Sequence, residues 1–248
     1  MNYINPPKVQ VQGVHHRTFY SRIYKHDIGY SIYLPDDDAS GDRWYPVAYH
    51  FHGWMGNESS EIQAMEKVCR GRKAITVFVN HAHVNGDVKD LPVAPMFIQE
   101  LLPHIDSLYQ TVSSREGRTL SGFSMGGGIA ARLAFRYPDL FSALVAYAGT
   151  YHHYFHKDYL TVGTPVEQAA EIYRTMMREE KFFDGNVLCE ASRYADSIRG
   201  QLKISLHVGT GDVLYCDNEI LHLHLNALQI PHEYRLFEGA DHALEKIL

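Results

Sequence analysis

A serine enclosed by small residues is the part of this sequence whose chemistry is easiest to predict. Ser124 stands at the centre of a Gly-x-Ser-x-Gly pattern over residues 122–126. Residues 117–121 before it predict a short strand, and residues 129–137 after it have helical periodicity that stops before a proline. A strand, a tight glycine-bracketed turn and a helix would hold the hydroxyl exposed on a strained backbone. The pattern therefore predicts a nucleophile, and a glycine-rich structural turn is the alternative.

A nucleophilic serine needs a base that takes its proton and a carboxylate that orients the base. On a strand–turn–helix scaffold, the acid and then the base follow the serine along the chain. Asp212 fits the acid because it ends a Gly-Thr-Gly-Asp turn after a predicted strand. His242 fits the base because, of 16 histidines, it alone follows the last predicted strand, residues 233–237. Asp217 is the rival acid, and we interpret it as the N-cap of a predicted helix.

Acyl transfer also needs two N–H donors for the developing oxyanion. The amide of Met125, the residue after the serine, is the expected first donor. The second donor should come from the loop after the third predicted strand, at His52-Gly53-Trp54. A glycine in this loop lets the backbone approach a substrate closely, so we expect the amide of Trp54 to serve. A plain turn is the alternative interpretation.

The elements that must position these residues alternate along the chain. Two strands with antiparallel character come first, at residues 14–24 and 29–35. Strands are then predicted at 45–51, 74–79, 117–121, 143–148, 202–208 and 233–237, and helices at 58–70, 97–109, 129–137, 218–228 and from 243 onward. This order predicts one α/β domain over residues 1–248, with a doubly wound, mainly parallel sheet and antiparallel N-terminal strands.

Residues 149–199 are too long for an ordinary connection between two strands. We interpret them as a helical insertion that caps the site. The segment begins with a run rich in tyrosine and histidine, for which an aromatic wall and ordinary packing are equally good interpretations. We expect Tyr151 or His152 to line a substrate pocket there, together with His52 from the opposite loop.

Composition narrows the class of partner. The net charge of −6 argues against nucleic acid or an anionic membrane as a partner. The three cysteines, Cys69, Cys189 and Cys216, are odd in number and widely spaced, which predicts reduced thiols and a cytoplasmic location. Residues 1–7 lack the charged and apolar regions of a signal peptide, although export with a signal already removed stays an alternative.

Two histidine pairs raise the question of a metal. His50 and His52 lie two positions apart, as do His81 and His83, so each pair would share one face of a strand. A metallohydrolase would also need a carboxylate-rich second cluster, and the sequence offers none beside these pairs. We therefore expect neither a metal nor another cofactor.

Four blocks in a fixed order resemble the esterases of the esterase D and feruloyl esterase type, carbohydrate esterase family 1. The blocks are residues 29–35, residues 45–47 with His52-Gly53, the Gly122 turn, and residues 209–212 with the terminal Gly-x-x-His242. The likeness covers nearly the whole chain from about Phe19. It implies an α/β-hydrolase fold and a Ser-Asp-His carboxylesterase. It also favours Asp212 over Asp217, because the acid of that family follows the Gly-Thr turn.

The residues and the resemblance together predict a cofactor-free serine esterase that works through an acyl-enzyme. The expected substrates are aromatic acyl esters, such as feruloyl or cinnamoyl esters, or short acyl esters, carried by a small molecule or a saccharide. A thioesterase or acyltransferase on the same residues is one alternative, and a non-catalytic binding module on a hydrolase scaffold is another. The sequence leaves open whether the protein forms a homo-oligomer.

Overall fold

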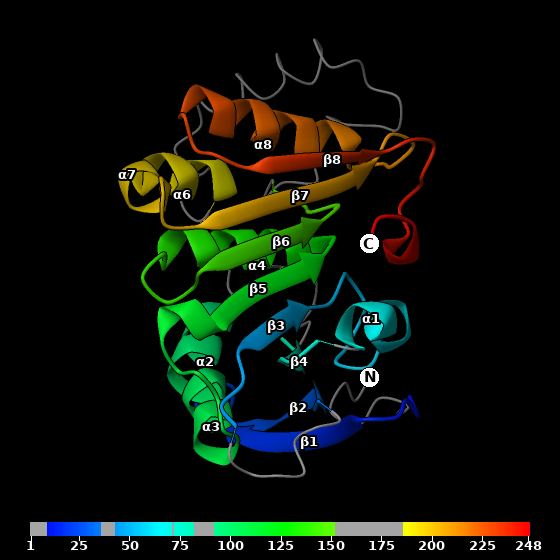
Figure 1. Cartoon of the computed structure of the whole chain (residues 1–248), viewed down its shortest axis with the longest axis vertical. Coiled ribbons are helices and arrows are strands. Elements are labelled where there is room, and N and C mark those ends of the chain that lie inside the picture. Colours follow the sequence, from blue (N-terminus) through cyan, green and yellow to red (C-terminus); the bar gives the residue numbers. More distant parts are fainter. Residues whose placement is uncertain (1–8, 36–42, 71, 82–91, 152–185) are drawn as a thin grey trace.

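One eight-stranded sheet forms the centre of the molecule (Figure 1). The structure is a computed structural model that describes residues 9–35, 43–70, 72–81, 92–151 and 186–248. The strands are β1 (Val14–Ser21), β2 (His26–Tyr33), β3 (Val47–Phe51), β4 (Ile75–Val79), β5 (Arg118–Phe123), β6 (Ala143–Tyr147), β7 (Lys203–Gly209) and β8 (Glu233–Phe237). They lie in the order β1-β2-β4-β3-β5-β6-β7-β8.

The pairing confirms the predicted sheet. β2 is antiparallel to both β1 and β4, and the pairs from β4 through β8 are parallel. All residues of β4 are buried, as expected for a parallel strand covered on both faces, whereas the edge strand β8 has no buried residue. β5 lies between β3 and β6, so the carboxyl ends of these three strands meet around the residue that follows β5.

Helices cover both faces of the sheet. They are α1 (Ile62–Cys69), α2 (Val93–Met96), α3 (Leu102–Leu108), α4 (Met125–Arg136), α6 (Val187–Arg193), α7 (Ala195–Ile198) and α8 (Tyr215–Ala227), with a π-helical turn η2 (Phe97–Leu101) and 3₁₀ turns η3 (Arg115–Gly117) and η5 (Leu244–Lys246). Figure 1 shows α1 and the C-terminal turn together, apart from α2, α3, α4 and α6. Two apolar clusters follow this division, a large one that includes α4 and a smaller one around α1 and η5.

The helix predicted at residues 97–109 differs from the structure in its length and its winding. A continuous helical run covers α2, η2 and α3, and its central turn is π-helical. The wider turn lies directly before Pro103, whose ring would crowd the carbonyl one turn earlier in a regular α-helix and whose nitrogen donates no hydrogen bond. The run therefore continues past Pro103, as the helical periodicity predicts.

The predicted insertion at residues 149–199 falls partly outside the described residues. Its last part forms α6 and α7, and α6 contacts both α4 and α8. Residues 152–185, including His152, lie outside the described part, so the cap stays a prediction. Among the helices of the described segments, none is both long enough and apolar enough to cross a bilayer.

We expect the unfolding free energy to fall as the pH drops below about 6.5, because burial lowers the pKa of four histidines: His104, His207, His224 and His232. His207, for example, donates its Nδ1–H to the carbonyl of Ile247 at 2.8 Å. The folded protein keeps these rings neutral where the unfolded chain already binds protons, so stability is fully present only above the unfolded pKa. Urea unfolding at several pH values between about 5 and 8 checks this. A constant unfolding free energy across that range would contradict it.

Candidate active site

Ser124 occupies a strained turn between β5 and α4. Its backbone has φ 54° and ψ −120°, a region that costs a residue with a side chain about 1–3 kcal/mol. Its N–H donates to the carbonyl of Tyr147 at 2.9 Å. Its own carbonyl accepts from the amides of Gly128 at 3.2 Å and Thr150 at 3.0 Å. The main chain alone therefore fixes the conformation of the turn.

The two glycines that bracket Ser124 permit a close approach of backbones. A Cβ on Gly122 would lie 2.3 Å from the carbonyl oxygen of Gly126, and a Cβ on Gly126 would lie 2.0 Å from the carbonyl oxygen of Phe51. Real Cβ atoms essentially never come closer than 3.0 Å to such atoms. These glycines thus let the start of α4 pack on the end of β3, which brings the β3 loop (residues 52–56) beside Ser124.

We expect Ser124→Gly to be more stable than Ser124→Ala by about 1 kcal/mol, because glycine accepts the positive φ without strain but loses more chain entropy. For a chain of this size, that difference raises Tm by about 2–4 °C. Thermal unfolding of the two variants side by side checks the expectation. Equal Tm values would mean that the turn carries no net strain.

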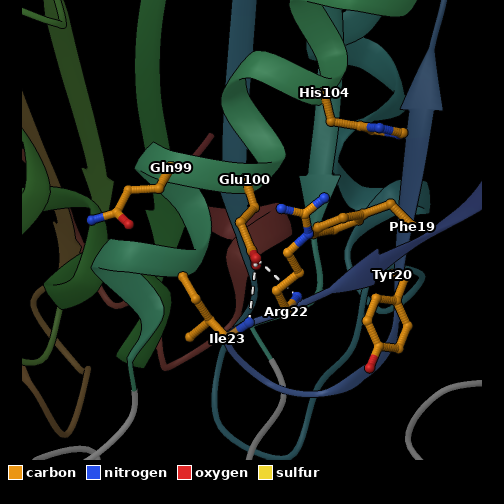
Figure 2. Close-up of a pocket in the computed structure, with 7 residues that line it drawn as sticks. All are labelled: Phe19, Tyr20, Arg22, Ile23, Gln99, Glu100 and His104. Carbon is orange, nitrogen blue, oxygen red and sulfur yellow. Dashed lines mark hydrogen bonds between the residues drawn. The ribbon is translucent and has the colours of Figure 1, made fainter.

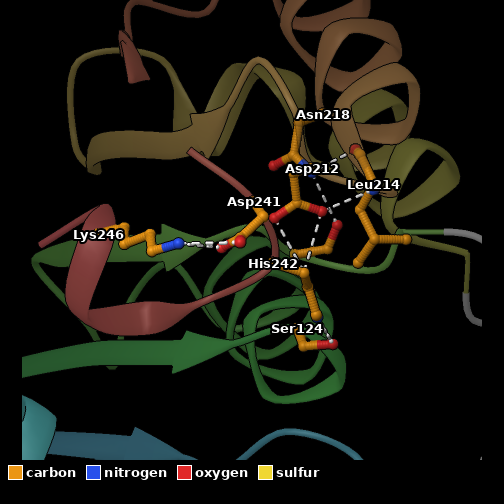
Figure 3. Close-up of polar contacts among 8 residues, drawn as sticks. Ser124, Asp212, Leu214, Asn218, Asp241, His242 and Lys246 are labelled. Atoms are coloured by element: carbon orange, nitrogen blue, oxygen red, sulfur yellow. Dashed lines mark hydrogen bonds and ion pairs between the residues drawn. The ribbon is translucent and has the colours of Figure 1, made fainter. Parts of the chain in front are cut away.

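His242 connects Ser124 to Asp212 (Figure 3). Its Nε2 lies 3.0 Å from the Ser124 Oγ, and its Nδ1 lies 2.9 Å from each carboxylate oxygen of Asp212. The Asp212 side chain is fully buried and also accepts the Leu214 N–H at 2.7 Å, whereas 29% of the His242 side chain is exposed. A ring that donates Nδ1–H to a buried carboxylate has its Nε2 available to accept a proton from the serine.

The loops after β7 and β8, which carry the acid and the ring, are hydrogen-bonded to each other. The Gly211 N–H donates to the carbonyl of Ala240 at 3.0 Å. The Gly239 N–H donates to the Thr210 Oγ1 at 2.8 Å. These bonds hold the two loops in one register, which explains why residues from adjacent strand ends meet at the Ser124 turn.

The His242 ring is restrained from its other side as well. The Phe123 ring stacks on it with centroids 4.7 Å apart and an interplanar angle of 28°. The preceding residue, Asp241, pairs instead with Lys246 on η5, at 2.8 and 2.9 Å (Figure 3). Asp212 and not Asp241 is therefore the carboxylate that orients the ring.

Both predicted oxyanion segments lie beside Ser124. Met125 is the first residue of α4, so its N–H has no acceptor within the helix. In the β3 loop, a Cβ built on Gly53 would lie 3.4 Å from the Ser124 Cβ, which shows how closely the two backbones approach. The Gly53 N–H donates to the Glu61 Oε1 at 2.8 Å, and Trp54 follows with 67% of its surface exposed.

The interpretation of Asp217 as a helix N-cap is wrong. α8 begins at Tyr215 with Leu214 as its N-cap, because the Asp212 turn already starts the helical winding, so Asp217 lies inside the first turn. Its buried carboxylate accepts the Tyr151 N–H at 3.1 Å. Asp217 therefore anchors the chain that leaves β6 and does not cap α8.

The residues predicted to line a substrate pocket are packed in the interior where the structure describes them. Tyr151 is 1% exposed and belongs to the larger apolar cluster, where its ring packs over Gly149. His52 is 2% exposed, donates Nδ1–H to the carbonyl of Gly53 and stacks on His81 at 3.8 Å. Neither ring presents an open surface, so we propose no pocket role for them. His152 lies outside the described residues.

His50, a candidate metal ligand by its spacing, has other partners. Its Nδ1 lies 2.9 Å from the Ser121 Oγ and its Nε2 lies 2.6 Å from the Glu61 Oε2. Within the described ranges, no three His, Cys, Asp or Glu side chains come together as a metal site would require, and His83 is outside those ranges. Sequence reasoning missed Glu61, because nothing in the local pattern indicates that its carboxylate reaches β3.

A surface cavity of about 610 Å³ lies elsewhere, at the β1 edge of the sheet (Figure 2). It is lined by residues of β1, the turn after it, η2 and α3: Phe19, Tyr20, Arg22, Ile23, Gln99, Glu100 and His104. The Glu100 carboxylate accepts the backbone N–H groups of Arg22 at 2.8 Å and Ile23 at 3.2 Å. Glu100 thus holds the β1–β2 turn, and the lining of this cavity does not include Ser124, Asp212 or His242.

A doubly wound sheet with a strained serine after its central strand, and an acid and a histidine in the last two loops, defines the α/β-hydrolase fold. The model of the family described as "Putative esterase" matches residues 21–245, and the chain belongs to this family. The predicted resemblance to esterases of the esterase D and feruloyl esterase type is confirmed.

Individual relatives are more distant. Esterase Rv1288 of Mycobacterium tuberculosis (strain ATCC 25618 / H37Rv) is 29% identical over 147 residues, which are 54% of this chain and 32% of that protein. The match thus spans about a third of the curated relative. A solved ferulic acid esterase superposes with a TM-score of 0.75 at 20% identity, covering 94% of this chain and 92% of that one. The S-formylglutathione hydrolase FrmB of Staphylococcus aureus gives 0.74 at 15% identity, with 93% and 92% covered. At these identities the two structures show a shared fold.

Proposed function

We propose that the protein is a serine carboxylesterase that works through an acyl-enzyme. The observation that carries this proposal is the position of His242, within hydrogen-bonding distance of the Ser124 Oγ on one ring nitrogen and of the Asp212 carboxylate on the other. Ser124 attacks the ester carbonyl carbon while His242 takes its proton, and Asp212 stabilises the imidazolium. His242 then gives the proton to the leaving alcohol, and a water molecule releases the acid by the same steps in a second round.

The amides of Met125 and Trp54 are the proposed donors to the oxyanion. Met125 N–H stands at the positive end of α4, where a developing negative charge is favoured. Trp54 stands in the β3 loop, whose Gly53 lies against Ser124. Two donors from different elements would enclose the carbonyl oxygen between them.

The proposed substrate is an aromatic acyl ester, such as a feruloyl or cinnamoyl ester, or a short acyl ester. The shared fold with a ferulic acid esterase supports the aromatic acyl group. Trp54 and Met55, which are 67% and 58% exposed, supply apolar surface directly after Gly53. Such side chains suit an aryl or alkyl group better than a charged one.

Thioester hydrolysis is the second candidate, and the likeness to S-formylglutathione hydrolase favours it. The same three residues would serve, because a thioester carbonyl also passes through a tetrahedral oxyanion. The two candidates differ in the leaving group that the site accepts.

A substrate panel tests these proposals. The kcat/KM values for p-nitrophenyl acetate, p-nitrophenyl butyrate, methyl ferulate, methyl cinnamate and S-formylglutathione would rank the ester classes against the thioester. Covalent labelling with a fluorophosphonate, located by mass spectrometry, asks separately whether Ser124 is reactive. No label and no turnover on any substrate would favour a non-catalytic binding module.

A further inference from the structure

A largely buried carboxylate lies behind the β3 loop. Glu61 directs one oxygen to the Gly53 N–H at 2.8 Å and the other to the His50 Nε2 at 2.6 Å. The Glu61 side chain is 11% exposed and the His50 side chain is 1% exposed. A carboxylate so placed forms charge-assisted bonds in a low-dielectric setting, where they are short and directional.

His50, a residue of β3, connects this carboxylate to the sheet. Its other nitrogen lies 2.9 Å from the Ser121 Oγ, and His50 and Ser121 are register partners on β3 and β5. Glu61 is itself fixed by its main chain, since it directly precedes α1 and its carbonyl accepts the Met65 N–H at 2.9 Å. The contacts therefore connect three elements: the strand before the β3 loop, the strand before Ser124 and the start of α1.

Gly53 stands between this carboxylate and the nucleophile. A Cβ built on Gly53 would lie 3.4 Å from the Ser124 Cβ and 3.5 Å from the Glu61 Oε1. Because the Gly53 N–H is bonded to Glu61, it is turned away from an oxyanion, and the next amide in the loop is that of Trp54. We infer that Glu61, held by His50, is a positioning residue that fixes the Gly53 peptide and so aims the Trp54 amide at the oxyanion; this inference rests on the proposed function.

The hydrogen bonds of Glu61 can be separated from its packing. Glu61→Gln keeps an oxygen for the Gly53 N–H, and its NH₂ group can donate to His50 in the other tautomer. Glu61→Leu has similar bulk but no acceptor, so the Gly53 N–H and the His50 ring lose their partner. Glu61→Asp keeps the charge but is one methylene shorter, so it cannot reach both partners at once.

We expect Glu61→Leu to lower kcat by about 10²–10³, the effect of losing one oxyanion donor, with KM nearly unchanged. Glu61→Asp should show an intermediate loss, and Glu61→Gln should stay within about tenfold of the unaltered enzyme. A boronic acid that mimics the tetrahedral intermediate should bind Glu61→Leu more weakly by a factor similar to the loss in kcat. After a long reaction time, fluorophosphonate should still label Ser124 fully in Glu61→Leu, since the hydroxyl and its base are intact.

Glu100→Leu is the matched control, because Glu100 also accepts two backbone N–H groups but lies on η2 at the β1 edge. It should lower Tm and leave kcat unchanged. An unaltered kcat in Glu61→Leu, or a loss confined to KM, would overturn the inference. If Glu61→Leu does not fold, a folded Glu61→Asp with normal kcat and normal boronic acid affinity would overturn it as well. Absent labelling and turnover in the unaltered enzyme would instead mean that the proposed function fails.

Discussion

Ser124→Ala should lower ester turnover by several orders of magnitude and abolish acyl-enzyme formation, because no other hydroxyl shares the contact with His242 Nε2 in the described residues. Alanine keeps the Cβ of serine, and the hydrogen bonds of the turn come from the main chain, so the fold should be unchanged. Initial rates on an activated ester and mass spectrometry after fluorophosphonate treatment measure the two effects.

Ser142→Ala is a suitable control for that experiment. In the unaltered protein, the Ser142 Oγ donates to the carbonyl of Arg118 at 3.1 Å, at the opposite end of β5 from Ser124. It should label and turn over normally. If Ser124→Ala retained the label, or if another serine carried it in the unaltered protein, the nucleophile would have to be sought elsewhere.

Asp212→Asn should lower kcat by about 10⁴-fold without unfolding the protein. The asparagine oxygen can still accept the Leu214 N–H, so the turn after β7 keeps its bond. Its NH₂ group, however, would face His242 Nδ1 and favour the tautomer that has the proton on Nε2, where the serine proton must arrive. Steady-state kinetics, with circular dichroism as a check on folding, measures the loss.

Asp217→Asn is the matched comparison, since Asp217 is equally buried and close in sequence. Its amide oxygen can still accept from Tyr151, so we expect a stability cost of about 1 kcal/mol and a kcat close to that of the unaltered enzyme. The opposite order of the two kinetic losses would make Asp217 the acid of the proposed mechanism.

The fold and the position of Ser124 in the turn between β5 and α4 could be predicted because their signals are local. The Gly-x-Ser-x-Gly pattern contains the small residues that a tight turn around a serine requires. The alternation of buried strands and helices predicts the sheet. Asp212 and His242 could be placed because the carboxyl ends of parallel strands meet at one edge.

Other features depend on partners that no local pattern indicates. Asp217 has the sequence context of a helix cap, but its carboxylate accepts a bond from Tyr151, 66 positions away. The alternation of His50 and His52 indicates a shared strand face, but not that Glu61 lies opposite one of them. Burial of Tyr151 likewise follows from packing over Gly149 and not from its aromatic character.

The conformation of Ser124 is maintained by peptide groups of β6, α4 and the segment after β6, so it does not depend on the hydroxyl. Removing that single oxygen should therefore leave a receptor of native shape that binds an ester without consuming it. Ser124→Ala could then serve as a substrate trap, in which an uncleaved ester survives long enough for co-crystallisation. Mixtures of natural esters could be screened by what this variant retains, and the bound compound identified by its mass.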